Sequence, residues 1–210
     1  MRDDRFSAAL GAASVFLLLA LLGGEAEPAA LRASQGCGIA PPGAPGETTT
    51  RSIEVGGLDR EYRLHLPPGY DRDTAASLVL VFHGYTSSAR VVELETTKMS
   101  GHADQHSYVV VYPQSTSFLA ADGSSVKSWN DGSCNASPGP ESPICSGDAT
   151  DYPHPPECGE SSRCDWCTCH DDVTFVDRLL DELGETLCLD LDRVYAWHEQ
   201  RRDVRPPSGL

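Results

Sequence analysis

The stretch LVLVFHGY, residues 78–85, decides the fold of this 210-residue chain. Its first five residues, Leu78-Val79-Leu80-Val81-Phe82, contain no polar interruption. Such a run is typical of a strand that is buried on both faces, as in a parallel sheet. His83-Gly84-Tyr85 follow at once. A glycine at the end of a strand lets backbone N–H groups point into a cleft. The histidine fits a structural role as well as a functional one.

Outward from this strand, predicted strands and helices alternate. Residues 108–112 (YVVVY) predict a second buried strand, and the weak periodicity of residues 89–104 suggests a helix before it. A clear amphipathic helix is predicted from residue 171 to its stop at Gly184, and its first residues, Asp171-Asp172, are interpreted as caps rather than catalytic groups. Val194-Tyr195-Ala196 predict a third buried strand. This order predicts an α/β fold with a mostly parallel sheet.

The rest of the domain is less regular. Residues 52–55 and 61–66 flank Gly56-Gly57 and predict a β-hairpin. Residues 27–50 are rich in Pro, Gly, Ala and Thr and are interpreted as a linker, so that the domain spans residues 51–196. Residues 115–170 show no convincing periodicity and are interpreted as a long excursion, whose cysteine-rich insertion spans residues 134–170.

The N-terminus indicates export. Residues 6–24 are nearly free of polar groups, follow Arg2 and Arg5, and end in small residues. Residues 1–26 therefore predict a secretory signal peptide, with an uncleaved membrane anchor as the alternative. We expect an extracellular protein that does not touch the membrane once this peptide is removed. The 16 basic and 31 acidic side chains give a net charge of −15, which argues against binding nucleic acid or anionic membranes through charge.

Cysteine chemistry follows from the compartment. Outside the cytoplasm, disulfides are the first interpretation, and their connectivity stays open. The candidates are the eight cysteines Cys37, Cys134, Cys145, Cys158, Cys164, Cys167, Cys169 and Cys188. A zinc site around residues 158–170 is conceivable, but ligands crowded this closely rarely all reach one ion. We therefore assign no metal ligand and expect no cofactor.

Taken together and in order, several stretches resemble the secreted polyhydroxybutyrate depolymerase and feruloyl (acetylxylan) esterase family of α/β hydrolases. The stretches are GCG (36–38), REYRLHLPPGYD (60–71), SLVLVFHGYTSS (77–88), VVVYPQ (109–114), SWN (128–130), DDVTFVDRLLDEL (171–183) and LCLDLDRVYA (187–196). The resemblance implies the N-terminal part of an α/β-hydrolase fold, incomplete at its C-terminal side. It also implies Ser-His-Asp chemistry on a polymeric ester, either a polyester or an acylated plant polysaccharide. The oxyanion would be held by backbone N–H groups around His83, Gly84 and Tyr85.

The resemblance ends after Ala196. In this family RVYA typically leads into Gly-Met-Ser-Asn-Gly-Gly, the nucleophile elbow, whereas here the tail 197–210 begins Trp-His-Glu-Gln-Arg-Arg-Asp. The genetic code allows those codons, read one base later, to encode Gly-Met-Ser-Asn-Gly-Gly. We therefore interpret residues 197–210 as a frameshift-like tail, with a divergent natural C-terminus as the alternative.

This interpretation has functional consequences. The nucleophile and the rest of the triad are expected beyond Ala196, so no catalytic residue is assigned within the chain. We expect residues 1–210 alone to be inactive and poorly stable, because a strand built for the interior of a sheet would present an open edge. The alternative function is a non-catalytic extracellular module that disulfides or zinc stabilise through residues 134–170.

Overall fold

The computed structural model describes residues 31–119, 123, 125–130, 168 and 170–199. Within these residues a five-stranded sheet has the order β1-β2-β4-β3-β7. Its strands are β1 (Thr48–Val55), β2 (Leu58–His65), β3 (Ala76–Phe82), β4 (Val109–Pro113) and β7 (Leu189–His198). β2 is antiparallel to both of its neighbours, and β3 is parallel to both of its own. Four strands therefore run in one direction, and the predicted α/β fold with a mostly parallel sheet is confirmed.

The first two strands form the predicted hairpin. It is longer than the sequence pattern indicated, because pairing runs from Thr48↔His65 to Val55↔Leu58. Gly56 and Gly57 close it with φ values of 62° and 79°. Both values lie in the left-handed region, which glycine enters without a steric penalty and which tight hairpin turns require.

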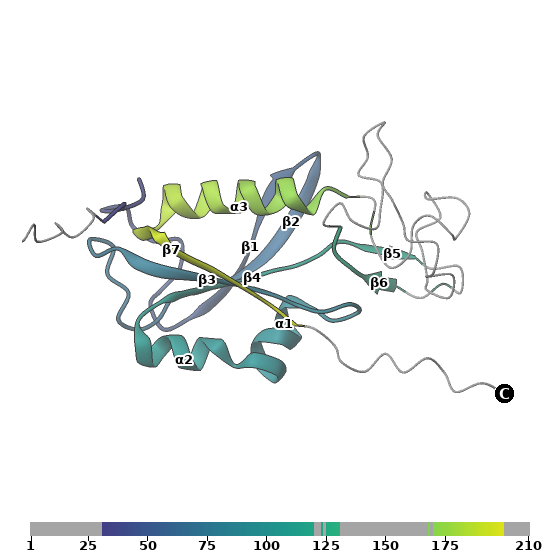
Figure 1. The fold of residues 1–210 in the computed structure, drawn as a ribbon, viewed down its shortest axis with the longest axis horizontal. Helices are drawn as coiled ribbons and strands as arrows, with labels where there is room; N and C mark the ends of the chain where they lie inside the picture. The colour runs from purple at the N-terminus through teal and green to yellow at the C-terminus, as the bar shows by residue number, and fades with distance from the viewer. Residues whose placement is uncertain (1–30, 120–122, 124, 131–167, 169, 200–210) are drawn as a thin grey trace, which may run out of the picture. The chain divides into compact units, whose positions relative to one another are not determined.

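Helices cover both faces of the sheet (Figure 1). On one face lie the short helix α1 (Ala89–Val91), the π-helix η1 (Val92–Thr97) and α2 (Met99–His106); on the other lies α3 (Asp172–Thr186). The core on the α3 face contains Leu80, Val111, Phe175, Leu179 and Leu183, and that on the α2 face contains Val81, Val92, Ala103, Val110 and Tyr112. No helix in the described part of the chain is long and apolar enough to cross a membrane.

The α3 helix departs from the prediction at both ends. Asp171 is the N-cap, since its carboxylate accepts the Thr174 N–H at 2.9 Å, but Asp172 faces the interior and does not cap. The helix also continues past Gly184 to Thr186, so the predicted stop was wrong. The Gly184 carbonyl, in the last turn of the helix, accepts the Gly36 N–H at 2.8 Å.

β7 differs from the predicted buried strand. It covers ten residues and stands last in the order of described strands, with Tyr195 56% and Trp197 37% exposed. Prediction of a buried strand at residues 194–196 was therefore wrong for the described chain, although the strand itself exists and pairs with β3. The apolar residues that suggested burial lie instead on the edge strand of the sheet as far as the structure describes it.

The N-terminal segment is fastened to the start of β7. Residues 31–47, which the sequence analysis assigned to a linker, make defined contacts: the Ser34 N–H donates to Leu189 O at 2.8 Å, and Cys37 forms a disulfide with Cys188. A Cβ on Gly36 would lie 2.3 Å from the Leu187 nitrogen, so only glycine allows this approach. A second, unpredicted hairpin joins β5 (Ser117–Leu119) to β6 (Ser125–Lys127).

Candidate functional site

The candidate site lies where parallel strands β3 and β7 end. Ligands in open α/β sheets bind outside the carboxyl ends of parallel strands, where connecting loops diverge. Here Phe82 is the last residue of β3 and His198 the last of β7, and the two are paired. The predicted oxyanion residues His83, Gly84 and Tyr85 follow Phe82 directly. The structure therefore brings them to the edge at which a ligand is expected.

His83 is a structural side chain. It is completely buried, and its Nδ1–H donates to the Gly84 carbonyl at 2.8 Å. Its Nε2 accepts from the Ser115 N–H at 3.1 Å and from the Gln114 amide at 3.0 Å, and these donors assign the neutral tautomer. Burial lowers the pKa of His83 from 6.5 to about 4. The imidazole is therefore neutral near pH 7 and holds the loop in place.

Gly84 supplies the anion-binding group of the loop. Its backbone N–H donates to the Glu199 Oε2 at 3.1 Å. A Cβ at this position would lie 3.0 Å from the Glu199 carbonyl oxygen, so the glycine also permits the close approach of that segment. The N–H that the sequence analysis assigned to an oxyanion hole thus binds a carboxylate oxygen in this chain.

The rest of the turn is held by β6 and by Trp129. The Thr86 N–H donates to Lys127 O at 2.8 Å and fixes Thr86 at φ 63°, an unusual value for a β-branched residue. Tyr85 packs against Val126. The Trp129 indole N–H donates to the His83 carbonyl at 2.8 Å, and the centres of the two rings are 5.0 Å apart.

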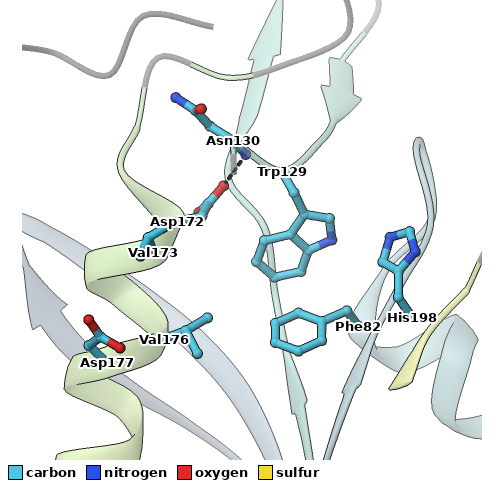
Figure 2. Close-up of a pocket in the computed structure, with 8 residues that line it drawn as sticks. All are labelled: Phe82, Trp129, Asn130, Asp172, Val173, Val176, Asp177 and His198. Carbon is cyan, nitrogen blue, oxygen red and sulfur yellow. Dashed lines mark hydrogen bonds between the residues drawn. The ribbon is translucent and has the colours of Figure 1, made fainter. Parts of the chain in front are cut away.

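A pocket of about 410 Å³ opens beside this turn, between α3 and the sheet (Figure 2). Phe82 and Trp129 form an aromatic wall, in edge-to-face contact at 5.3 Å, and Val173 and Val176 line the helix side. Its polar lining residues are Asn130, Asp172, Asp177 and His198. The described lining thus offers an imidazole and carboxylates, but neither a hydroxyl nor a thiol that could act as a nucleophile.

Asp172 at the pocket wall is held in a buried ion pair. Its Oδ1 contacts the Arg60 guanidinium, and its Oδ2 accepts the Asn130 N–H at 2.6 Å. The side chains are 5% and 3% exposed, and the guanidinium lies 4.0 Å from the centre of the Phe175 ring. Burial raises the pKa of Asp172, and Arg60 opposes that shift. Asp172 therefore has a structural role. This agrees with the interpretation that it is not catalytic, but not with the prediction that it caps the helix.

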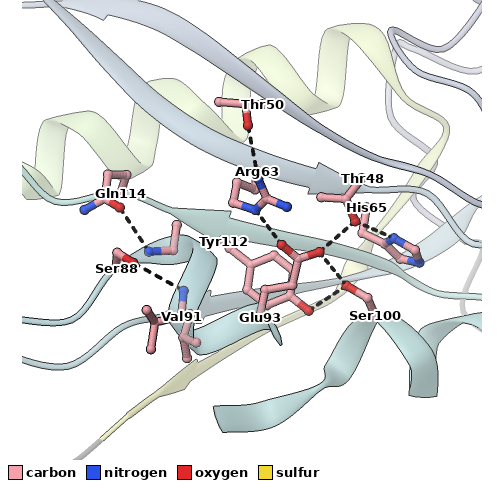
Figure 3. A network of polar contacts seen from close by, with 12 residues as sticks. Thr48, Thr50, Arg63, His65, Ser88, Val91, Glu93, Ser100, Tyr112 and Gln114 are labelled. Carbon is pink, nitrogen blue, oxygen red and sulfur yellow. Dashed lines mark hydrogen bonds and ion pairs between the residues drawn. The ribbon is translucent and has the colours of Figure 1, made fainter. Parts of the chain in front are cut away.

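A second polar cluster lies on the α2 face (Figure 3). Glu93 is 2% exposed, and its carboxylate accepts hydrogen bonds from Thr48 at 2.7 Å, Ser100 at 3.1 Å and the Arg63 Nε at 2.5 Å. Burial raises the pKa of the neighbouring Tyr112 to about 12. A buried charge needs such partners, and here they come from the β1–β2 hairpin and from α2. The cluster therefore joins the hairpin to η1 and has a structural role.

The structure describes two of the eight candidate disulfide cysteines, Cys37 and Cys188, and they pair across 151 residues of sequence. The other six lie outside the described residues: Cys134, Cys145, Cys158, Cys164, Cys167 and Cys169. Most of the segment proposed for zinc also lies outside them. The pairing of those six cysteines stays a prediction.

Three features of the site were not predicted from the sequence: Glu199, Gln114 and the Arg60–Asp172 pair. Gln114 and Trp129 lay within stretches that carried the family resemblance, VVVYPQ and SWN, but no local pattern gave them a role. The Arg60–Asp172 pair joins residues 112 positions apart, a separation at which periodicity gives no signal. Glu199 lies in the tail that was set aside as out of pattern.

Comparison with known proteins gives only distant structural likenesses. No family model and no curated protein matches the chain. An S-formylglutathione hydrolase from Agrobacterium tumefaciens aligns over 73% of this chain and 48% of its own, with 15% identity and a TM-score of 0.41. The thermostable carboxylesterase EstE1, cloned from a metagenomic library, aligns over 77% and 39%, with 17% identity and a TM-score of 0.37. The chain spans about half or less of these hydrolase and esterase structures, and likeness at this level carries no conclusion about activity.

Proposed function

We propose that this chain carries the oxyanion-hole part of a secreted serine esterase that acts on polymer-linked esters. The observation that carries the proposal is the backbone N–H of Gly84, which donates to a carboxylate oxygen at 3.1 Å beside the end of β3. Ester hydrolysis develops negative charge on the carbonyl oxygen, and preorganised N–H donors stabilise that charge. Neutral His83 suits this role, because both of its ring nitrogens take part in hydrogen bonds that fix the turn.

The nucleophile is proposed to lie in the neighbouring reading frame after the Ala196 codon. The described pocket lining supplies no hydroxyl or thiol, and the shifted codons allow a serine within Gly-Met-Ser-Asn-Gly-Gly. A serine attacks an ester only when a histidine accepts its proton and a carboxylate orients that histidine. We therefore expect residues 1–210 alone not to hydrolyse esters.

Secretion and substrate class belong to the same proposal. The Cys37–Cys188 disulfide fits an oxidising compartment, and residues 6–24 fit a signal peptide. The family resemblance supports polymeric substrates, either hydroxyalkanoate polyester or feruloyl and acetyl esters of plant polysaccharide. The aromatic wall of Phe82 and Trp129 is compatible with both kinds of acyl group.

One experiment tests the proposal and its alternative, the non-catalytic module. The DNA beyond the Ala196 codon is sequenced, and two proteins are expressed: residues 1–210, and the product of the gene with the shifted frame restored. We expect hydrolysis of a short-chain nitrophenyl ester only by the second protein, and its loss when the restored serine is changed to alanine. DNA that does not encode the elbow, or hydrolysis by residues 1–210, contradicts the proposal. A stable, cooperatively folding 210-residue chain with no elbow downstream favours the module.

A further inference from the structure

Glu199 is bound at the end of β3 like a ligand. Its Oε2 accepts the Gly84 N–H at 3.1 Å, and its Oε1 accepts the Thr96 hydroxyl at 3.3 Å. These donors come from two elements, the loop after β3 and η1. The backbone N–H of Glu199 also donates to Phe82 O at 3.0 Å, which holds the main chain beside the loop. Both carboxylate oxygens are therefore satisfied, one by each donor.

Glycine at position 84 leaves room for the main chain of Glu199. A Cβ there would lie 3.0 Å from the Glu199 carbonyl oxygen and 3.5 Å from Oε2. A side chain at position 84 would therefore crowd the Glu199 main chain, whereas its contact with the Glu199 carboxylate would be an ordinary van der Waals one. A carboxylate and a developing oxyanion present the same acceptor to such a donor, a negatively charged oxygen.

We propose that Gly84 and Thr96 form a carboxylate-binding site and that Glu199 is its internal ligand, which closes the site to external carboxylates. The ligand class is a small monocarboxylate, the product class of ester hydrolysis. The proposal rests on the proposed function only for the assignment of the Gly84 N–H as an oxyanion donor. An internal ligand acts at an effective concentration of the order of millimolar or more, so an external carboxylate must compete with it.

Amide NMR of the oxidised 210-residue chain tests this directly, with sodium acetate as the probe and sodium chloride at equal ionic strength as the reference. In Glu199→Ala we expect the Gly84 amide signal to shift and saturate with acetate. The apparent dissociation constant should be at least about tenfold lower than in the unchanged chain, the effect of losing one charge-assisted competitor. The matched control is Glu95→Ala, which removes an exposed carboxylate from η1 and should behave like the unchanged chain.

Two further variants keep the test decisive. Glu199→Gln retains the side-chain volume but removes the charge, so it replaces Glu199→Ala if that variant does not fold. It should also bind acetate more tightly than the unchanged chain. Adding Thr96→Val to either variant should weaken acetate binding severalfold, because one hydrogen-bond donor is lost. Equal acetate affinity with and without the Glu199 charge, or no Gly84 response in any variant, overturns the proposal. Neither result depends on ester hydrolysis, so the esterase proposal succeeds or fails separately.

Discussion

Replacing Asp172 by alanine should destabilise the domain more than any comparable change at its surface. The substitution leaves the Arg60 guanidinium, which is 3% exposed, without its carboxylate and in contact with the Phe175 ring. It also removes the acceptor of the Asn130 N–H. Breaking a buried ion pair at one partner costs about 3–5 kcal/mol, because the remaining charge stays buried and uncompensated.

The matched control is Asp181→Ala on the same helix. Asp181 pairs with Arg178 at 3.8 Å, and their side chains are 69% and 67% exposed. An exposed pair of this kind contributes about 0–1 kcal/mol. Both substitutions remove one aspartate from α3 and one ion pair, so the difference between them reports the buried ion pair together with the Asn130 hydrogen bond.

The assay is urea unfolding of the oxidised chain at pH 7, followed by far-ultraviolet circular dichroism. With a urea dependence of about 2 kcal/mol per molar, a loss of about 4 kcal/mol lowers the midpoint by about 2 M, against about 0.5 M or less for the control. Arg60→Met combined with Asp172→Leu should recover much of the loss, since it removes both charges. Equal midpoints for Asp172→Ala and Asp181→Ala would refute the reasoning.

Three further predictions concern stability. Changing Cys37 and Cys188 to alanine should cost about 5 kcal/mol by loop-closure entropy, measured by urea unfolding against the oxidised chain; an unchanged midpoint contradicts it. Gly36→Ala should lower the free energy of unfolding by at least about 1–3 kcal/mol, because the added Cβ would lie 2.3 Å from a backbone atom. In the control, Gly101→Ala in α2, the added Cβ has no atom within 4 Å, so the change should be neutral or stabilising by up to about 1 kcal/mol. Because the pKa of His83 is lowered in the folded chain, the unfolded chain takes up the proton at a higher pH. The free energy of unfolding should therefore decrease by up to about 3 kcal/mol as pH falls from 6.5 to about 4. His83→Gln should flatten that part of the stability–pH curve, and an identical curve would count against it.

The central strands were predictable because their signals are local. Uninterrupted apolar runs identified β3 and β4, and a glycine pair between alternating residues identified the β1–β2 hairpin. The boundary of α3 was not predictable in the same way. Glycine at position 184 favours a helix end, but α3 continues to Thr186, and the Gly184 carbonyl accepts the Gly36 N–H from a segment about 150 residues earlier. Tertiary contacts of this kind override local propensity, and they leave no signal in the local sequence.

The site was predictable only in part, for the same physical reason. The glycine after β3 located the turn, but the groups that hold the turn come from residues after β4, from β6 and the residues after it, and from the tail. Paired aspartates at the start of α3 show the limit clearly. Asp171 caps the helix as expected, whereas its neighbour pairs with Arg60 on β2. Two identical adjacent residues thus take different roles, and only the packing of α3 on the sheet distinguishes them.

His83 shows how the structure decides between roles that the sequence left open. Its Nδ1–H and the Ser87 N–H both donate to the Gly84 carbonyl, at 2.8 and 3.1 Å. A peptide unit is planar and trans, so fixing the Gly84 carbonyl also fixes the N–H of Tyr85, which points in the opposite direction. A buried, neutral imidazole therefore sets the orientation of the next backbone donor without touching a substrate. Protonating Nε2 would remove the acceptor of two hydrogen bonds, those from Ser115 and Gln114, which hold the imidazole in place. The histidine after β3 thus acts as a positioning residue for the turn.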